Sequence, residues 1–213
     1  MHDILNYTKD DKMKRLLFRR LLAYIVDIAF ISIVAGFLSF ALMPKSKYNE
    51  YAKANQEYQQ KYVEYLTNSE EYNIDDLIEM SYRIEQNSFT INITNIVCII
   101  AYFGILQYIW GYTIGKKLFK LKVVGLKKKG LSIYQYFIRT IFNNRLLSAS
   151  ILIVLLKTIS QSNFIYCTNI INKVSSLFTI VSIGFILFNK KNRGLHDLIS
   201  GTKVIYEKGE SDG

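Results

Sequence analysis

One acidic residue lies inside the first long apolar run of the chain. Asp27 falls within residues 21–43, where almost every other side chain is apolar. A carboxylate at that depth in a bilayer is costly, and such residues usually mark a functional site with a partner nearby. A carboxyl group surrounded by hydrocarbon holds its proton more tightly than in water and exchanges it near neutral pH. Asp27 is therefore a candidate for binding a proton or a cation.

An arginine precedes this aspartate at helical spacing. Arg20 and Asp27 are seven residues apart, which is about 10 Å along a helix and nearly two full turns. The two side chains therefore share one face of a helix. A structural alternative follows, in which Asp27 forms an ion pair or an interhelical hydrogen bond that fixes packing. The sequence leaves the functional and the structural hypotheses open.

A second aspartate is isolated near the C-terminus. From Gln86 to Tyr206 the chain contains one acidic residue, Asp197, preceded by His196. The structural hypothesis places Asp197 in a short helical turn between Gly194 and Gly201, capping backbone donors or pairing with an arginine. The functional hypothesis makes His196 and Asp197 a proton-exchanging pair. A lone His-Asp pair lacks the further ligands that a metal site requires.

Asp197 has many candidate cationic partners and no acidic competitor in this stretch, and arginines lie at the inner level of Asp27. The cationic candidates are Arg20, Arg139 and Arg193. An ionised carboxylate left alone in the bilayer would cost several kcal/mol. We therefore expect Arg20 and Asp27 to approach Arg139, Arg193 or Asp197.

A glycine-rich segment follows the second apolar run. Residues 111–117 contain Gly111, Thr113, Gly115 and Lys116, but the glycine spacing is one residue too short for a phosphate-binding loop, and no Ser or Thr follows the lysine. We interpret the segment as a turn that Thr113 caps. No nucleophile-and-base motif is present, so the sequence predicts no enzyme activity, no metal site and no cofactor.

Four apolar runs can position these residues in a bilayer. They cover about 21–43, 91–110, 142–160 and 170–188, each near the ~20 residues that a transmembrane helix needs. The last two runs are weaker, and a re-entrant pair within 146–188 is the alternative.

The charges orient these runs. Residues 1–20 carry six basic and three acidic residues, residues 114–145 carry nine basic and none acidic, and residues 44–90 carry five basic and nine acidic. Basic loops stay in the cytoplasm. The pattern predicts a multi-pass protein of the bacterial cytoplasmic (inner) membrane with both termini inside and 44–90 outside.

The composition agrees with a membrane location. Half of the residues are apolar and the formal net charge is +10, with lysines and arginines beside the apolar runs. That placement favours anionic lipids of the inner face as partners rather than nucleic acid. Neither Cys98 nor Cys167 belongs to a CxxC pair, which argues against thiol metal ligands.

The segment 44–90 has a helical repeat of its own. Tyr51, Tyr58, Tyr62 and Tyr65 lie within a seam of three- and four-residue steps. The pattern predicts an extracytoplasmic helical hairpin packed on itself. Two alternatives are a helix lying flat on the headgroups and a tyrosine-lined ligand site.

Two short segments alternate apolar and polar residues, as β-strands do. They are 119–123 and 202–206, the second beginning at Thr202. Isolated strands need a partner, so we expect a small cytoplasmic two-strand ribbon. Between them, residues 132–143 have the periodicity of an amphipathic helix that carries Arg139.

Three motifs in this order resemble the RDD family of bacterial membrane proteins. They cover residues 20–27, 111–124 and 193–204, within a matching region of 15–206. The segment 44–90 is longer and more polar than the family core requires. The resemblance implies an integral membrane protein, and it implies sodium–proton antiport for some members.

The combined prediction is an all-α membrane protein with four transmembrane helices, the ribbon and the outer hairpin. Residues 1–206 form one RDD-type domain with 44–90 inserted in it, and 207–213 form a cytoplasmic tail. The expected function is transport of a small cation, with cation/proton exchange as one form of it, or of another small ligand, by a homo-oligomer. The alternative is an accessory, immunity or assembly subunit that binds another membrane protein through 44–90.

Overall fold

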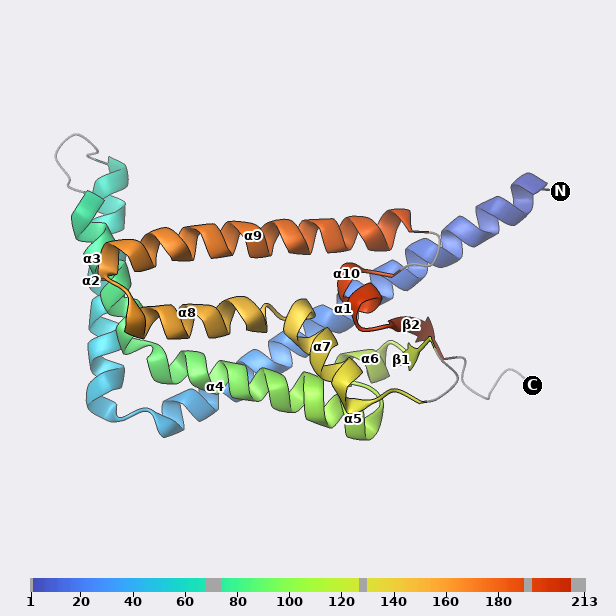
Figure 1. Ribbon diagram of the computed structural model, residues 1–213, viewed down its shortest axis with the longest axis horizontal. Helices are drawn as coiled ribbons and strands as arrows, with labels where there is room; N and C mark the ends of the chain where they lie inside the picture. The colour runs from blue at the N-terminus through green and yellow to red at the C-terminus, as the bar shows by residue number, and fades with distance from the viewer. Residues whose placement is uncertain (1, 68–73, 127–129, 190–192, 208–213) are drawn as a thin grey trace. The chain divides into compact units, whose positions relative to one another are not determined.

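The computed structural model describes residues 2–67, 74–126, 130–189 and 193–207, and within them the chain is mostly helical (Figure 1). The end of the predicted tail, the tip of the 44–90 segment and the links at 127–129 and 190–192 lie outside the described residues. The helices are α1 His2–Leu42, α2 Lys45–Thr67, α3 Ile74–Asn87, α4 Phe89–Ile99, α5 Gln107–Trp110, α6 Ile114–Leu118, α7 Ile133–Asn143, α8 Leu146–Thr158, α9 Gln161–Phe188 and α10 Leu195–Ile199. A π-helix, Ile100–Leu106, joins α4 to α5.

Three described helical stretches are long and apolar enough to cross a membrane. They are Arg15–Leu42, Phe89–Trp110 and Gln161–Phe188. A fourth candidate is the pair α7 and α8, which is bent by 69° and reads as either a broken span or a re-entrant loop. Arg145 lies at this bend with φ of +54°, a left-handed conformation that a continuous helix does not contain.

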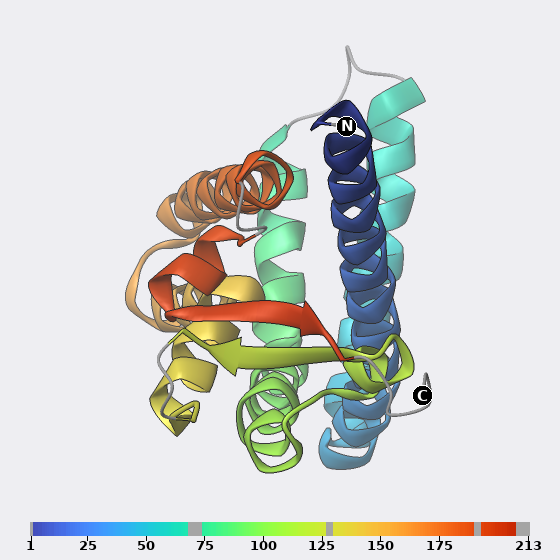
Figure 2. The ribbon, with the colours of Figure 1, turned by 90° about the vertical axis from the view of Figure 1, so that its right-hand side faces the viewer.

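The predicted ribbon is confirmed as two antiparallel strands, β1 Leu121–Gly125 and β2 Thr202–Tyr206 (Figure 2). Leu121 pairs with Tyr206, and Gly125 pairs with Thr202. The first strand begins two residues later than the alternation predicted, because Lys120 adopts a positive φ of +54° after α6. Its inner side chains pack on α1 and α7 in a core of Ala23, Leu121, Val123, Tyr136 and Val204.

The chain divides into two compact units. The first consists of Met1–Ile33, Cys98–Leu146 and Ser176–Gly213, and it contains the ribbon and all three motifs. The second consists of Val34–Val97 and Leu147–Ser175.

The second unit holds α2 and α3 together with α8. Lys61 of α2 lies 3.6 Å from Asp76 of α3, and the ring of Tyr82 packs edge-on against Phe164. Tyr58 and Tyr62 stack on each other along α2 with ring centroids 6.0 Å apart. Part of the tyrosine seam therefore packs against side chains of its own helix.

Candidate functional site

Three hydrogen-bond donors surround the side-chain carboxylate of Asp27. Its side chain is 1% exposed. The hydroxyl of Tyr102 and the backbone N–H of Gly115 both donate to Oδ1 at 2.7 Å, and the hydroxyl of Thr113 donates to Oδ2 at 2.5 Å. Three short hydrogen bonds stabilise an ionised carboxylate inside a protein far better than hydrocarbon does.

The motif at 111–116 builds this cradle from backbone geometry. Gly111 ends α5 in the left-handed region at φ +77°, which a glycine adopts without strain. Thr113 then takes an extended conformation as the N-cap of α6, and its hydroxyl accepts from the backbone N–H of Lys116. The turn therefore presents the hydroxyl of Thr113 and the backbone N–H of Gly115 to Asp27.

Gly115 permits the close approach of α6 to α1. A Cβ at this position would lie 2.9 Å from Cγ of Asp27 and still closer to the backbone oxygen of Ala23. Only a glycine fits where two backbones meet in this way.

Tyr102 reaches the same site from the π-helix. Its hydroxyl donates to Asp27 and also accepts from the backbone N–H of Ile114 at 2.9 Å, so it links α1 to the start of α6. π-Helical segments often occur at functional sites. Nothing in the sequence had singled out this tyrosine, because its apolar neighbours read as continuous helix.

Lys116 is the cation nearest to Asp27. Its Nζ lies 4.0 Å from Oδ2, 3.2 Å from Oγ1 of Thr113 and 3.5 Å from Oε1 of Gln107. Burial, and then the positive charge of Arg139, lower the pKa of this ammonium to about 7, although Asp27 opposes the shift. Lys116 therefore exchanges its proton near neutral pH.

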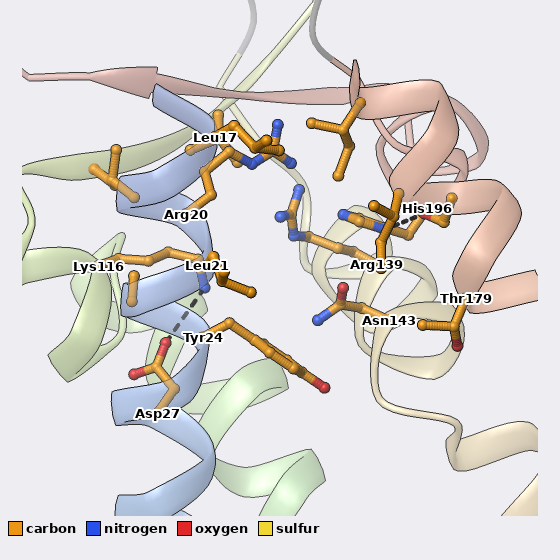
Figure 3. A pocket seen from close by; sticks show the side chains of 16 residues that line it. Leu17, Arg20, Leu21, Tyr24, Asp27, Lys116, Arg139, Asn143, Thr179 and His196 are labelled. Atoms are coloured by element: carbon orange, nitrogen blue, oxygen red, sulfur yellow. Dashed lines mark hydrogen bonds and ion pairs between the residues drawn. The ribbon is translucent and has the colours of Figure 1, made fainter. Parts of the chain in front are cut away.

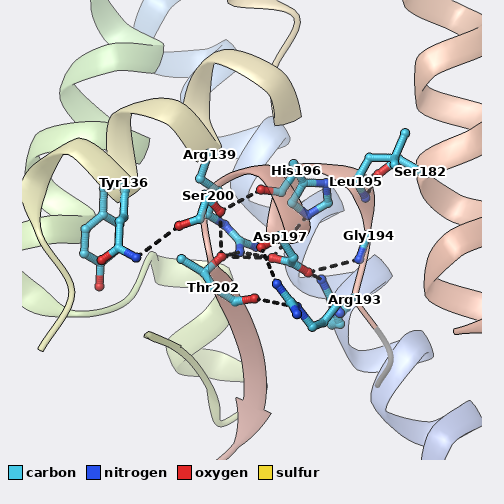
Figure 4. Close-up of polar contacts among 12 residues, drawn as sticks. Tyr136, Arg139, Ser182, Arg193, Gly194, Leu195, His196, Asp197, Ser200 and Thr202 are labelled. Atoms are coloured by element: carbon cyan, nitrogen blue, oxygen red, sulfur yellow. Dashed lines mark hydrogen bonds and ion pairs between the residues drawn. The ribbon is translucent and has the colours of Figure 1, made fainter. Parts of the chain in front are cut away.

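Asp197 is the centre of a second charge cluster (Figure 4). Its side chain is fully buried, and it accepts hydrogen bonds from Arg20 at Oδ2, 2.5 Å away, and from Arg139 at Oδ1. Thr202 and the backbone N–H of Gly194 complete the set at 3.4 and 3.3 Å. Burial alone would raise the pKa of Asp197, but the two guanidinium groups outweigh it and hold the pKa below its usual range.

Arg193 serves the backbone of the same turn. Its Nε donates to the carbonyl oxygen of Thr202 at 3.0 Å, and its Nη2 donates to that of Asp197 at 3.1 Å. It thereby joins α10 to the start of β2 across Gly201, which has a positive φ of +65°.

His196 lies beside Asp197 but bonds elsewhere. Its Nδ1 is 3.1 Å from the hydroxyl of Ser182, which also accepts from the backbone N–H of Leu195. Burial, followed by the charge of Arg139, lowers the pKa of His196 to about 3. The ring is therefore neutral at physiological pH, and it serves to pack α10 against α9.

The structure thus groups the predicted residues into two clusters. Arg20, Arg139, Arg193 and His196 surround Asp197, while the motif at 111–116 surrounds Asp27. Arg20 reaches across 177 positions to Asp197 instead of serving Asp27 as its nearest cation. Sequence spacing placed Arg20 and Asp27 on one helix face. It did not show with which acid each cation would form an ion pair.

A cavity of about 300 Å³ connects the two clusters (Figure 3). Its polar lining includes Arg20, Tyr24, Asp27, Lys116, Arg139 and His196. Most of the remaining wall is apolar and comes from α1, α9 and the ribbon, including Leu17, Leu21, Ile183 and Val204. The cavity is partly open, and its volume lies at the lower end of small-molecule sites.

Among the described residues there is no group of three or more His, Cys, Asp or Glu side chains that would hold a metal ion. Both buried carboxylates instead take their partners from the protein itself. The charged and polar side chains at the cavity wall can therefore bind a ligand through ion pairs and hydrogen bonds.

The comparisons with known proteins bear on the three motifs. The model of the RDD family matches residues 15–201, which include Asp27, the 111–116 turn and Asp197. Comparisons with curated proteins and with solved structures gave no match.

Proposed function

The chain belongs to the RDD family, and we propose that it binds a small solute in the cavity and carries it across the bacterial inner membrane. One observation carries this proposal. Arg20 and Asp27 of α1, Lys116 of α6 and Arg139 of α7 come from three separated parts of the chain, yet all of them line one partly open cavity. Structural ion pairs alone do not require a cavity beside them, whereas a binding site does.

The proposed arrangement in the membrane has four spans. The bent pair of α7 and α8 supplies the third, both termini and the ribbon are cytoplasmic, and α2 and α3 are extracytoplasmic. The charge asymmetry between 114–145 and 44–90 supports this orientation. Four spans enclose little space, so the transporting form would be a homo-oligomer.

Lys116 and Asp27 form the proposed functional pair, in which Lys116 carries the exchanging proton. They lie 4.0 Å apart, and Lys116 has a pKa of about 7, so a small change in the field of the cavity changes its charge. Asp197 is held by two arginines and serves as an anchor that keeps Arg20 and Arg139 at the cavity wall. His196 is proposed to pack α10 against α9, and its hydrogen bond with Ser182 supports this role.

Proton movement in proteoliposomes tests the proposal. Vesicles loaded with a pH-sensitive dye would receive imposed gradients of sodium, potassium or acetate. At least one gradient should drive a pH change above that of empty vesicles, and Asp27→Asn should reduce it tenfold or more. The control is Glu207→Gln, because Glu207 pairs with Lys122 on the exposed side of the ribbon. Equal proton movement in wild type, Asp27→Asn and empty vesicles would remove the proposal.

A second candidate function rests on the α2–α3 hairpin. Three neighbouring side chains of α2, Tyr62, Val63 and Leu66, are 41–63% exposed. Exposed apolar side chains gathered on one helix are a common feature of protein interfaces. The candidate is an accessory, immunity or assembly subunit that binds another membrane protein here. Replacing Val63 and Leu66 by serine would abolish a partner's binding but leave proton movement intact.

A further inference from the structure

The charges around the cavity do not balance among the described residues. Arg20, Arg139 and Lys116 line it, but the acids beside them are only Asp27 and Asp197. Within residues 86–206, which supply the cavity wall apart from α1, Asp197 is the one acid. Buried charges need partners, so the cavity attracts an anion when Lys116 is protonated.

Arg139 has donors to spare for such an anion. Its hydrogen bonds among the described residues, to Asp197 and Thr202, both leave from Nη1. A guanidinium has five N–H donors arranged in a fork that matches carboxylate and phosphate oxygens. Figure 3 shows the side chains of Arg20 and Arg139 approaching one another across the cavity from α1 and α7. Among the described residues the ammonium of Lys116 has hydrogen-bond contacts of 3.2 and 3.5 Å, lies 4.0 Å from Oδ2 of Asp27 and lies 5.6 Å from the ring centroid of Phe103. None of these contacts is short, so the ammonium is able to turn toward a ligand.

The rest of the wall suits an apolar chain. Leu17, Leu21, Ile183 and Ile186 lie along α1 and α9, which both contain apolar stretches long enough to cross a membrane. Leu21 is 53% exposed and Ile183 is 49% exposed although both line the cavity. They therefore mark its open side, and that side is apolar.

We propose that this cavity binds an amphiphile with one anionic head group, a carboxylate or a phosphate, and an apolar tail. The head group contacts Arg139 and Lys116, and the tail leaves between Leu21 and Ile183. The cavity volume of about 300 Å³ admits a head group and the first part of one chain, with the remainder outside. This inference rests on the proposed function only in taking the cavity as the solute site, and it names the class of that solute.

Thermal unfolding of the purified full chain in a non-ionic detergent tests the proposed amphiphile binding. Circular dichroism monitors the unfolding. The probes are oleate, its neutral analogue oleyl alcohol, and acetate, which has no tail. Dioleoylphosphatidylglycerol and dioleoylphosphatidylcholine form a second pair, which separates a membrane lipid from a free carboxylate as the source. A ligand near a hundred times its Kd raises the unfolding midpoint by several degrees. Oleate, phosphatidylglycerol or both should do so, and the neutral probes and acetate should not.

Two variants one helical turn apart localise the binding. Ile183→Trp places an indole across the open side of the cavity, whereas Ile180→Trp adds the same side chain to α9 at a position that is 67% exposed and outside the cavity lining. Ile183→Trp should lose the midpoint shift, and Ile180→Trp should keep it. Lys116→Gln should weaken oleate binding about tenfold, the loss expected for one charged hydrogen bond.

The outcomes separate this inference from the proposed function. Equal midpoint shifts with oleate and oleyl alcohol, or a full shift in Ile183→Trp, would overturn the anionic amphiphile. A shift with acetate as large as that with oleate would overturn the tail. Proton movement without amphiphile binding would remove the inference alone, and amphiphile binding without proton movement would remove transport alone.

Discussion

The backbone N–H of Gly115 donates to Oδ1 of Asp27 at 2.7 Å, although the two residues are 88 positions apart. The contact joins the first and second motifs of the chain and brings α6 against α1 with no room for a side chain. It explains why a glycine stands at this point of the sequence without any appeal to a phosphate-binding loop.

Gly115→Ala should therefore be strongly destabilising. Its Cβ would meet the backbone of Ala23, which cannot move aside as a flexible side chain would. Overpacking costs about 1–3 kcal/mol where side chains yield, and here we expect the upper end of that range or loss of folded protein. Unfolding in detergent measures it. Gly36→Ala is the matched control, because its Cβ would meet nothing within 4 Å and alanine favours a helix.

Asp197→Asn should cost about 3–5 kcal/mol of folding free energy, because it leaves Arg20 and Arg139 buried without their counter-charge. The double variant Asp197→Asn with Arg139→Gln should recover part of the loss. Glu207→Gln serves as the control, since the pair of Glu207 with Lys122 is about half exposed and such pairs contribute about 0–1 kcal/mol. Equal losses in Asp197→Asn and Glu207→Gln would contradict a buried charge cluster.

Much of this architecture follows from local patterns. The apolar runs, the alternation that pairs β1 with β2, and the three motifs are readable because each depends on neighbouring residues. The partners of Asp27 are not readable in that way. Tyr102 and Thr113 reach it only after α4, the π-helix and α5 have turned the chain back onto α1. Likewise, Arg20 pairs with Asp197 because tertiary packing brings α10 to α1. The helical spacing of residues in α1 does not encode that packing.

Stability should depend on pH through Lys116. Its pKa is about 7 in the folded chain and 10.5 in the unfolded chain, so the unfolded state binds more protons between these values. Stability therefore rises with pH across pH 7 to 10.5, by at most about 1.4 kcal/mol per pH unit. The groups that face Lys116 are Asp27 and Arg20 from α1, Arg139 from α7 and Asp197 from α10.

Unfolding midpoints at pH 7, 8 and 9 isolate this contribution. Lys116→Met should flatten the rise relative to wild type, because methionine fills similar space without a titrating group. Lys117→Met is the control, since the neighbouring lysine is exposed. Parallel pH profiles for wild type and Lys116→Met would refute a shifted Lys116.

Thiol labelling tests the orientation in the membrane. After Cys98 and Cys167 are replaced by alanine, one cysteine is introduced at Lys53 or at Lys203. Lys53 has an 80% exposed side chain on α2, and Lys203 is exposed on β2. An impermeant maleimide should label Lys53→Cys in intact cells and label Lys203→Cys only after lysis. Labelling of Lys203→Cys in intact cells would place the ribbon outside and reverse the proposed topology.

Tyr102→Phe tests the contribution of Tyr102, a hydrogen-bond partner of Asp27 that lies outside the three motifs. The change removes a hydroxyl that donates to Asp27 and accepts from the N–H of Ile114, while the ring keeps its edge-on contact with Phe103. The buried carboxylate of Asp27 and the part-buried N–H of Ile114 then each lose one hydrogen bond, and one such bond contributes about 0.5–1.5 kcal/mol, more when a partner is charged. We expect a clear drop in the unfolding midpoint together with reduced proton movement in proteoliposomes. Tyr108→Phe is the matched control, because Tyr108 lies one helical segment further on, is 43% exposed and has no hydroxyl bond in the described residues. If both phenylalanine variants behave alike, the hydroxyl of Tyr102 does not position Asp27, and the cradle around that carboxylate would rest on Thr113 and Gly115 alone.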